Sequence, residues 1–248
     1  MTHSILIIGQ SNMAGRGIMT EVEPIRNDRL RVLRNGRWCA MFCPVNPDRP
    51  FSGISLAESF IDEYSKEHDV NVGIIPCADG GTCLDQWKVG GLLYQNAVNH
   101  VKLAQRTSVV VGVLWHQGES DCQENLILEY ESKFLDIMNG LRKECNLENV
   151  PFLLGGLGDF LSECEFSPYL KNYSKVNDIL EKIARENDMT GFVSAKGLTS
   201  NADKLHFNSK SLREFGIRYY NEFKSFESRI TYNYDNLEDY IKTELEKY

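Results

Sequence analysis

Short apolar runs that are rich in β-branched residues alternate along the chain with longer amphipathic stretches, and this alternation restricts the possible folds. Apolar runs of this kind predict strands that are buried on both faces. Helices joining parallel strands by right-handed crossovers cover both faces of a sheet. The alternation therefore predicts an α/β fold, a three-layer α/β/α sandwich around a five-stranded parallel sheet. The expected strands are Ser4–Ile8, Val72–Ile75, Val109–Trp115, Phe152–Leu154 and Phe192–Ser194.

Apolar residues recur at intervals of three and four in four segments between or after these strands, which is the spacing of amphipathic helices. The sequence Ser211-Leu-Arg-Glu214 has the spacing of a capping box and is expected to start the last helix. The stretch from Leu30 to Gly53 has no period, and we expect a long loop over the carboxyl end of the sheet. The expected helical stripes are Leu56–Tyr64, Ile127–Leu141, Leu170–Ile183 and Leu212–Phe226.

No repeat, low-complexity segment or Gly/Ser linker divides the chain, so we expect one domain over residues 1–248. Residues 227–248 are acidic and rich in tyrosine, and we expect a peripheral C-terminal helix or tail there. The 27 Lys and Arg against 35 Asp and Glu give a net charge of −8. This balance argues against binding to nucleic acid or to an anionic membrane.

Two further features concern the compartment. The apolar run Ser4–Ile8 is shorter than the core of a signal peptide, so we expect the mature chain to begin near Met1. The seven cysteines are scattered and never spaced C-x-x-C, which favours reduced thiols over disulfides or a zinc ribbon. We therefore expect a cytoplasmic protein. The sequence indicates no oligomeric state.

Polar motifs follow the expected strands, at the edge where parallel sheets bind their ligands. The first is Gly9-Gln-Ser-Asn-Met-Ala-Gly-Arg-Gly17, a turn that exposes Ser11. Its spacing fits neither a P-loop, nor a dinucleotide-binding motif, nor G-x-S-x-G. Taken alone, it is equally consistent with a structural turn in which Ser11 caps the backbone.

The other motifs follow later strands. Gly80-Gly-Thr82 offers backbone amides to an anion, although a glycine pair is more often a tight turn. His116-Gln-Gly-Glu-Ser-Asp121 is dense in polar groups, but no further ligand accompanies His116 and Glu119, so no metal is expected. In Asp203-Lys-Leu-His206 a carboxylate can orient an imidazole whose other nitrogen acts as a base, although a surface turn has the same pattern.

Taken together, these segments resemble the SGNH hydrolase superfamily, specifically its sialate O-acetylesterase-like and acetylxylan-esterase-like carbohydrate esterases. The match covers Gly9–Gly17, Gly80–Thr82 with Trp87, His116–Asp121 and Asp203–His206, in the family's order. The resemblance implies a flavodoxin-like sandwich and a serine esterase that removes acyl, usually acetyl, groups from sugar hydroxyls. It implies no metal and no other cofactor.

The resemblance also implies the roles of individual residues. Ser11 matches the nucleophile, His206 the base, and Asp203 the carboxylate that orients the base. The branch commonly has Ser where this chain has Cys83, a departure that does not touch these three positions.

The implied oxyanion hole combines the amide of Ser11, an amide of Gly80 or Gly81, and the side chain of Gln117. Gln117 takes the place of the Asn found in the wider superfamily. Glu119 is characteristic of the branch and is a candidate to support His206 or the oxyanion loop.

The implied partner is a small acetylated carbohydrate, and xylo-oligosaccharides, sialic acid and related sugars all remain open. Trp87 and Trp115 are candidates to stack on the sugar, although such residues more often pack in the core. Two other hypotheses remain. One is a flavodoxin-like, non-catalytic module that binds a phosphate or nucleotide in the first loop. The other is a short-chain esterase acting on a substrate that is not a sugar.

Overall fold

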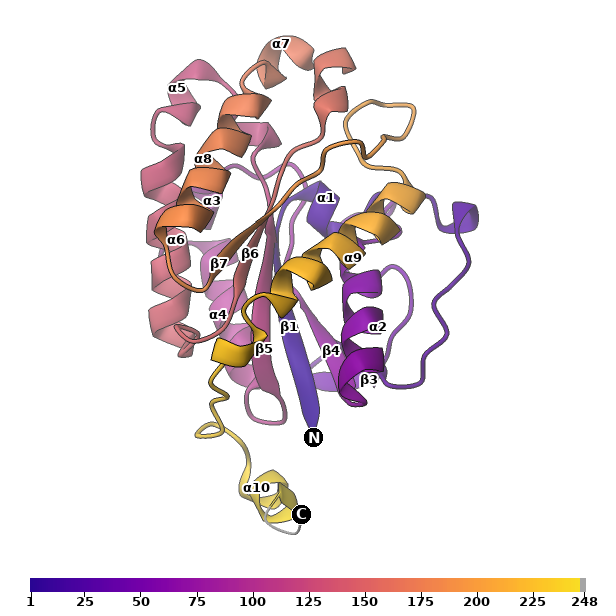
Figure 1. The fold of residues 1–248 in the computed structure, drawn as a ribbon, viewed down its shortest axis with the longest axis vertical. Helices are drawn as coiled ribbons and strands as arrows, with labels where there is room; N and C mark the ends of the chain where they lie inside the picture. Colours follow the sequence, from indigo (N-terminus) through magenta and orange to yellow (C-terminus); the bar gives the residue numbers. More distant parts are fainter. Residues whose placement is uncertain (246–248) are drawn as a thin grey trace.

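The computed structural model describes residues 1–245. The fold is built around a seven-stranded sheet with the strand order β3-β2-β4-β1-β5-β6-β7 (Figure 1). All neighbouring strands are parallel except β2 and β3, which pair antiparallel. The strands are β1 Thr2–Gly9, β2 Leu30–Arg34, β3 Arg37–Ala40, β4 Asn71–Pro76, β5 Val109–His116, β6 Phe152–Gly155 and β7 Thr190–Val193.

Helices cover both faces of the sheet, which confirms the three-layer sandwich (Figure 1). On one face α2 packs against α9, and on the other α6 packs against α4 and α8. The helices are α1 Ser11–Ala14, α2 Leu56–His68, α3 Leu84–Trp87, α4 Leu92–Ala104, α5 Glu124–Ile127, α6 Tyr130–Cys145, α7 Ser167–Leu170, α8 Tyr173–Glu186, α9 Ser209–Lys224 and α10 Asp239–Leu245. Short 3-10 helices lie at Met19–Glu21, Glu119–Asp121, Asp159–Glu163 and Glu227–Arg229.

The five expected strands are all present, but the count of five is wrong because β2 and β3 were missed. They form a hairpin at one edge of the sheet, inside the segment expected to be a loop. Its turn is Asn35-Gly36, where both residues have positive φ angles, 48° and 74°. Asn-Gly is the preferred pair for such a turn and was the available signal. The rest of the segment belongs to a loop at the carboxyl end of the sheet, residues 41–55, between β3 and α2.

The expected start of the last helix is also wrong. Helix α9 begins at Ser209, and its N-cap is Asn208, whose side-chain oxygen accepts from the amide of Ser211 at 2.9 Å. The hydroxyl of Ser211 is engaged elsewhere, because it accepts from the amide of Thr199 at 2.8 Å. Ser211 and Glu214 have the spacing of a capping box but lie inside the helix, so the spacing did not mark its start.

The segment expected to be peripheral ends in α10, which lies at the opposite end of the molecule from α1 (Figure 1). Arg106, just after α4, pairs with Glu238 and connects this segment to the main body. Residues 246–248 of the expected segment lie outside the described residues. Among residues 1–245, no helix is both long and apolar enough to cross a membrane.

Helices α2 and α9 pack closely at Gly216, and this contact yields a stability prediction. A Cβ at Gly216 would lie 2.1 Å from the carbonyl oxygen of Leu56 and 2.2 Å from Oγ of Ser59. Gly216→Ala is therefore expected to lower the free energy of unfolding by about 1–3 kcal/mol, the usual cost of overpacking. Urea denaturation measures the change. Lys210→Ala, on the exposed side of α9, is the control and should shift stability by less than about 0.5 kcal/mol. An unchanged Gly216→Ala would contradict the close packing.

Candidate active site

The turn after β1 places Ser11 at the carboxyl edge of the sheet. Gly9 has a φ of 127°, and a Cβ there would lie 2.1 Å from the carbonyl oxygen of His116. Only glycine permits this approach of two backbones. The amide of Gln10 then donates to the same oxygen at 2.9 Å, and α1 begins at Ser11. The end of β5 thus fixes the serine in space.

Ser11, His206 and Asp203 form a continuous hydrogen-bonded chain. Nε2 of His206 lies 3.0 Å from Oγ of Ser11, and Nδ1 lies 2.7 Å from Oδ2 of Asp203. Burial raises the pKa of Asp203, but hydrogen bonds from the amides of His206 and Leu205 and from the imidazole outweigh it and hold the pKa below its usual value. An ionised Asp203 accepts from Nδ1 of His206, so Nε2 is left to accept the proton of Ser11.

Asn12 connects this chain to the loop after β5. Its side-chain oxygen accepts from the amide of Phe207 at 3.1 Å, and its Nδ2 donates to the carbonyl of Leu205 at 3.3 Å. These contacts hold the backbone on both sides of His206. Nδ2 also donates to Oε1 of Glu119 at 2.6 Å. Glu119 therefore contacts the histidine loop through Asn12 and not directly.

A cavity of about 460 Å³ opens above Ser11. His206 and Glu119 line it together with the turn that carries Ser11, and three aromatic side chains contribute from two other segments. The expected nucleophile and base therefore face a space large enough for a small ligand. The remaining lining residues are Gln10, Arg16, Arg49, Phe51, Gly80, Gly81, Ser120, Gln123, Phe166, Tyr169, Leu170 and Leu205.

The structure distinguishes between the two glycines expected to offer an amide. The amide of Gly80 donates to Oδ2 of Asp48 at 2.8 Å and is therefore occupied. Gly81 has a φ of 78°, lines the cavity, and its amide has no acceptor among residues 1–245. Of the pair, Gly81 has the free donor.

The side chain of Gln117, which the resemblance implied as an oxyanion donor, does not face the cavity, and this expectation is corrected here. Its side chain is fully buried and does not line the cavity. Nε2 donates to the carbonyl of Thr82 at 3.1 Å and to the carboxylate of Asp121, which uses both of its hydrogens. Turning the amide over would set its oxygen against two acceptors. The contact with Asp121 is itself buried, and burial raises the pKa of that carboxyl to about 6.

Gln10 has the free side-chain amide that Gln117 lacks. Its Oε1 accepts from the amides of Gly118 and Ser120 at 3.3 and 3.4 Å. This pairing orients the side chain of Gln10, which is among the residues that line the cavity, and the hydrogen bonds of this side chain within residues 1–245 all go to Oε1, which leaves Nε2 free. Sequence reasoning missed this residue. Its position directly before Ser11, on the same turn, was the available signal.

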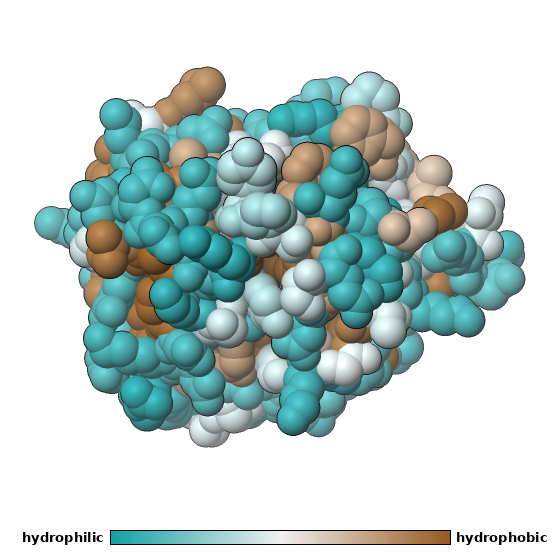
Figure 2. Space-filling model, turned by 90° about the horizontal axis from the view of Figure 1, so that it is seen from above, coloured by the Kyte–Doolittle hydropathy of each residue, from teal (hydrophilic) through white to brown (hydrophobic). Residues whose placement is uncertain are grey.

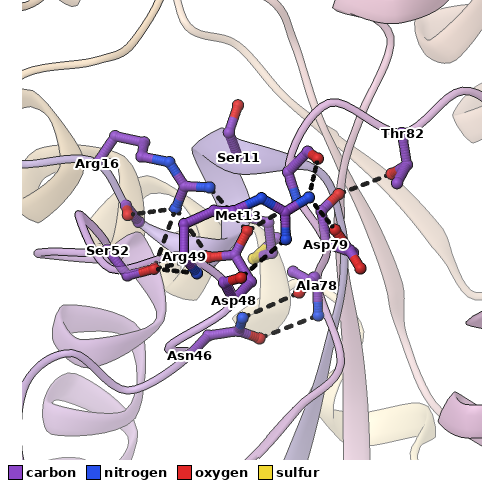
Figure 3. Close-up of polar contacts among 12 residues, drawn as sticks. Ser11, Met13, Arg16, Asn46, Asp48, Arg49, Ser52, Ala78, Asp79 and Thr82 are labelled. Carbon is purple, nitrogen blue, oxygen red and sulfur yellow. Dashed lines mark hydrogen bonds and ion pairs between the residues drawn. The ribbon is translucent and has the colours of Figure 1, made fainter.

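A polar network lies beneath Ser11 and joins the first loop to residues 41–55 (Figure 3). Nη1 and Nη2 of Arg16 pair with Asp48 at 3.0 and 2.7 Å, and both side chains are about 5% exposed or less. Burial raises the pKa of Asp48, but hydrogen bonds from Arg16, Ser52 and the Gly80 amide hold it below the usual value. No local sequence pattern marks these residues, because their contacts join segments distant along the chain.

The residues considered for a metal site have other contacts. Nε2 of His116 lies 3.2 Å from the carbonyl of Gly156, while its Nδ1 is 3.9 Å from Glu119. Burial lowers the pKa of His116. Within residues 1–245, no three His, Cys, Asp or Glu side chains gather in a way that could hold a metal ion.

The sandwich, with Ser11, Asp203 and His206 at the carboxyl edge of its sheet, places the protein in the class of SGNH-type hydrolases. Residues 1–225 match the family model described as "Carbohydrate esterase, sialic acid-specific acetylesterase". The chain belongs to this family, which confirms the resemblance and makes it a carbohydrate esterase.

Similar proteins agree with this placement. A protein of Arabidopsis thaliana named as a probable carbohydrate esterase is 25% identical over an alignment of 242 residues, and the match covers 86% of this chain and 86% of that protein. A solved structure of a protein from the same plant, 22% identical, has a TM-score of 0.81 and covers 92% of this chain and 99% of its own. The crystal structure of NanS, 15% identical, has a TM-score of 0.73 and covers 92% and 98%. The two solved structures show the shared fold.

The bridge made by Asn12 yields a second stability prediction. Asn12→Ala leaves the amide of Phe207 and the carboxylate of Glu119 without their buried partner. We expect a loss of about 1–3 kcal/mol in the free energy of unfolding, the cost of unpaired buried polar groups. Urea denaturation measures it, with Asn27→Ala as the control, since the side chain of Asn27 makes only exposed or partly exposed contacts, with Asp62 and with the amide of Arg29. A larger loss in the control than in Asn12→Ala would contradict the bridging role.

Proposed function

We propose that the protein is a serine esterase that removes O-acetyl groups from small acetylated carbohydrates through an acyl-Ser11 intermediate. The observation that carries the proposal is the hydrogen-bonded chain from Ser11 through His206 to Asp203, with the serine facing a cavity. A serine hydroxyl is a weak nucleophile at neutral pH and needs an adjacent base that is itself held in place.

The proposed reaction follows from these contacts. Nε2 of His206 takes the hydroxyl proton as Oγ of Ser11 attacks the ester carbonyl, and Asp203 stabilises the imidazolium that forms. His206 then protonates the sugar oxygen as the ester C–O bond breaks. Water attacks the acyl-serine with His206 again as the base, which releases acetate and restores Ser11.

Negative charge on the carbonyl oxygen needs preorganised donors. Three free donors belong to residues that line the cavity: the amides of Ser11 and Gly81 and Nε2 of Gln10. The amide of Ser11 is in the first turn of α1, where helical N–H groups have no partner within the helix. We assign the oxyanion hole to these three groups, with Gly81 in preference to Gly80 and Gln10 in place of Gln117.

The phosphate-binding hypothesis lacks a comparable observation. The two cations that line the cavity, Arg16 and Arg49, are each paired with a carboxylate, at 2.7 and 2.8 Å. A phosphate site would present unpaired cations to balance the charge of the phosphate. The hypothesis of a non-sugar substrate is tested by comparing acetylated sugars with acetyl and octanoyl esters of p-nitrophenol.

Replacing the nucleophile gives the first functional prediction. Ser11→Ala is expected to lower acetate release from p-nitrophenyl acetate and from acetylated sugars by at least about 1,000-fold, because no other group can form the acyl-enzyme. Steady-state kinetics measure the loss, and circular dichroism checks the fold. Ser132→Ala, an exposed serine of α6, is the control and should keep full activity. Full activity in Ser11→Ala would refute the proposal.

Replacing the side-chain donor gives the second functional prediction. Gln10→Glu keeps an oxygen for the amides of Gly118 and Ser120 but exchanges the donor for an acceptor. We expect kcat to fall by about 100- to 1,000-fold, as for loss of an oxyanion donor. Gln95→Glu makes the same exchange on α4, outside the cavity, and should keep the wild-type kcat.

Gln117→Ala separates the two glutamines. Because its amide has only internal partners, its loss should lower the free energy of unfolding by about 1–3 kcal/mol and lower kcat less than Gln10→Glu does. The assignment of Gln10 fails if Gln117→Ala, still folded, loses more kcat than Gln10→Glu.

A further inference from the structure

We infer that the cavity selects a neutral acetylated sugar ring over an acidic one, with the side chains of Phe51, Phe166 and Tyr169 as the surface on which the ring lies. This inference rests on the proposed function and deepens it, because it concerns which class of sugar the same cavity accepts. It depends on two features of the cavity: how its charges are paired, and which large side chains remain exposed around it.

The arginines of the cavity are both engaged within the protein. The guanidinium of Arg16 makes a bidentate contact with Asp48 and also donates to the carbonyl of Gly15 at 2.8 Å. Nη2 of Arg49 donates to Asp79 at 2.8 Å and to the carbonyl of Gly80 at 3.0 Å. In Figure 3 both guanidinium groups lie among these partners, and the hydroxyl of Ser11 points away from them. Neither arginine offers the free, forked donor pair that binds a carboxylate.

The charge around the cavity is negative. Arg16 and Arg49 are outnumbered by Asp48 and Asp79, which pair with them, and by Glu119 and Asp203. Together these two cations and four carboxylates carry a net charge of −2. Lys204, next to Asp203, is itself paired with Glu163 at 3.0 Å. A substrate carboxylate would therefore enter a negatively charged site that offers it no counter-ion. The unfavourable free energy of this repulsion is larger in a cavity than in water, because the dielectric constant is lower there.

Three aromatic rings line the same cavity and remain largely exposed: Phe51 by 69%, Phe166 by 53% and Tyr169 by 62%. They come from the loop at residues 41–55 and from the segment around α7. The ring of Phe51 lies 5.3 Å from the guanidinium carbon of Arg16, which steadies it. Trp87 and Trp115, the aromatic candidates of the sequence, are fully buried in the core and cannot contact a ligand.

Exposed aromatic side chains that gather around one cavity mark a surface that a ligand covers. Seen from above, hydrophobic side chains stand among hydrophilic ones on the face that Figure 2 shows. A pyranose ring matches this mixture, because its C–H faces are apolar and its hydroxyls lie at the rim. Ser120 and Gln123 line the cavity and supply uncharged groups for those hydroxyls. The aromatic surface and the absence of a free cation both favour a neutral sugar.

The charge argument is tested with two ligands that differ only in the group at C6: an O-acetylated methyl glucuronoside, which is an anion, and its neutral carboxamide. Calorimetry with Ser11→Ala measures binding without turnover. We expect the carboxamide to bind at least about tenfold more tightly than the acid, by 1.4 kcal/mol or more. Asp79→Asn in the same Ser11→Ala background removes the carboxylate that pairs with Arg49, and it should reduce the ratio between the affinities for the carboxamide and for the acid. Equal or tighter binding of the acid, or an unchanged ratio in Asp79→Asn, overturns the inference.

The aromatic surface is tested by substitution in the same Ser11→Ala background. Tyr169→Ala should weaken binding of the carboxamide by about 3- to 10-fold, the range for a lost aromatic contact, whereas Tyr169→Phe keeps the ring and should bind normally. Tyr240→Ala removes a tyrosine of α10 that is 61% exposed and should have no effect. Unchanged binding in Tyr169→Ala overturns the inference. These arms measure binding, so failure of wild-type acetate release would refute the proposed function separately.

Discussion

The contact between the ends of β1 and β5 is the constraint on which the rest of the site depends. Gly9 lets the two backbones approach, and the amide of Gln10 then bonds to the carbonyl of His116. This contact fixes where α1 starts, and so where Ser11 points. It also brings the loop after β5 within reach of Gln10, whose side chain takes two amides from that loop. Ser11 and Gln10, the proposed nucleophile and side-chain donor, are therefore positioned by one short piece of backbone.

Side chains from distant parts of the chain lie next to Ser11 in the folded protein. His206 lies 195 residues after Ser11, and Asn12 holds the backbone on both sides of that histidine. Such a buried network is stabilising only when its members are all paired, because each unpaired polar group costs about 1–3 kcal/mol. The same bonds that stabilise the fold thus keep His206 at hydrogen-bonding distance from Ser11, so a substitution that weakens them is expected to change both the stability and the geometry of the site.

The residues around this catalytic set differ from it in origin and in the role that we expect for them. The loop at residues 41–55 supplies Asp48, Arg49 and Phe51, none of which belongs to the motifs shared with the family. Asp48 neutralises Arg16 and occupies the amide of Gly80, which leaves Gly81 as the free donor of the pair. We expect the chemistry to be set by the strand ends and the choice of sugar by this loop and α7.

The five central strands and the sandwich could be predicted from periodicity, which is a local property of the chain, and the set Ser11, Asp203 and His206 from the motifs that carry the family resemblance. Periodicity missed the hairpin at one edge of the sheet, where polar residues interrupt the pattern and only Asn35-Gly36 signals the turn. That Gln10 lines the cavity and Gln117 does not could be seen only in the folded protein. Both side chains are amides, and which one is left without a partner depends on contacts that form when separate segments meet.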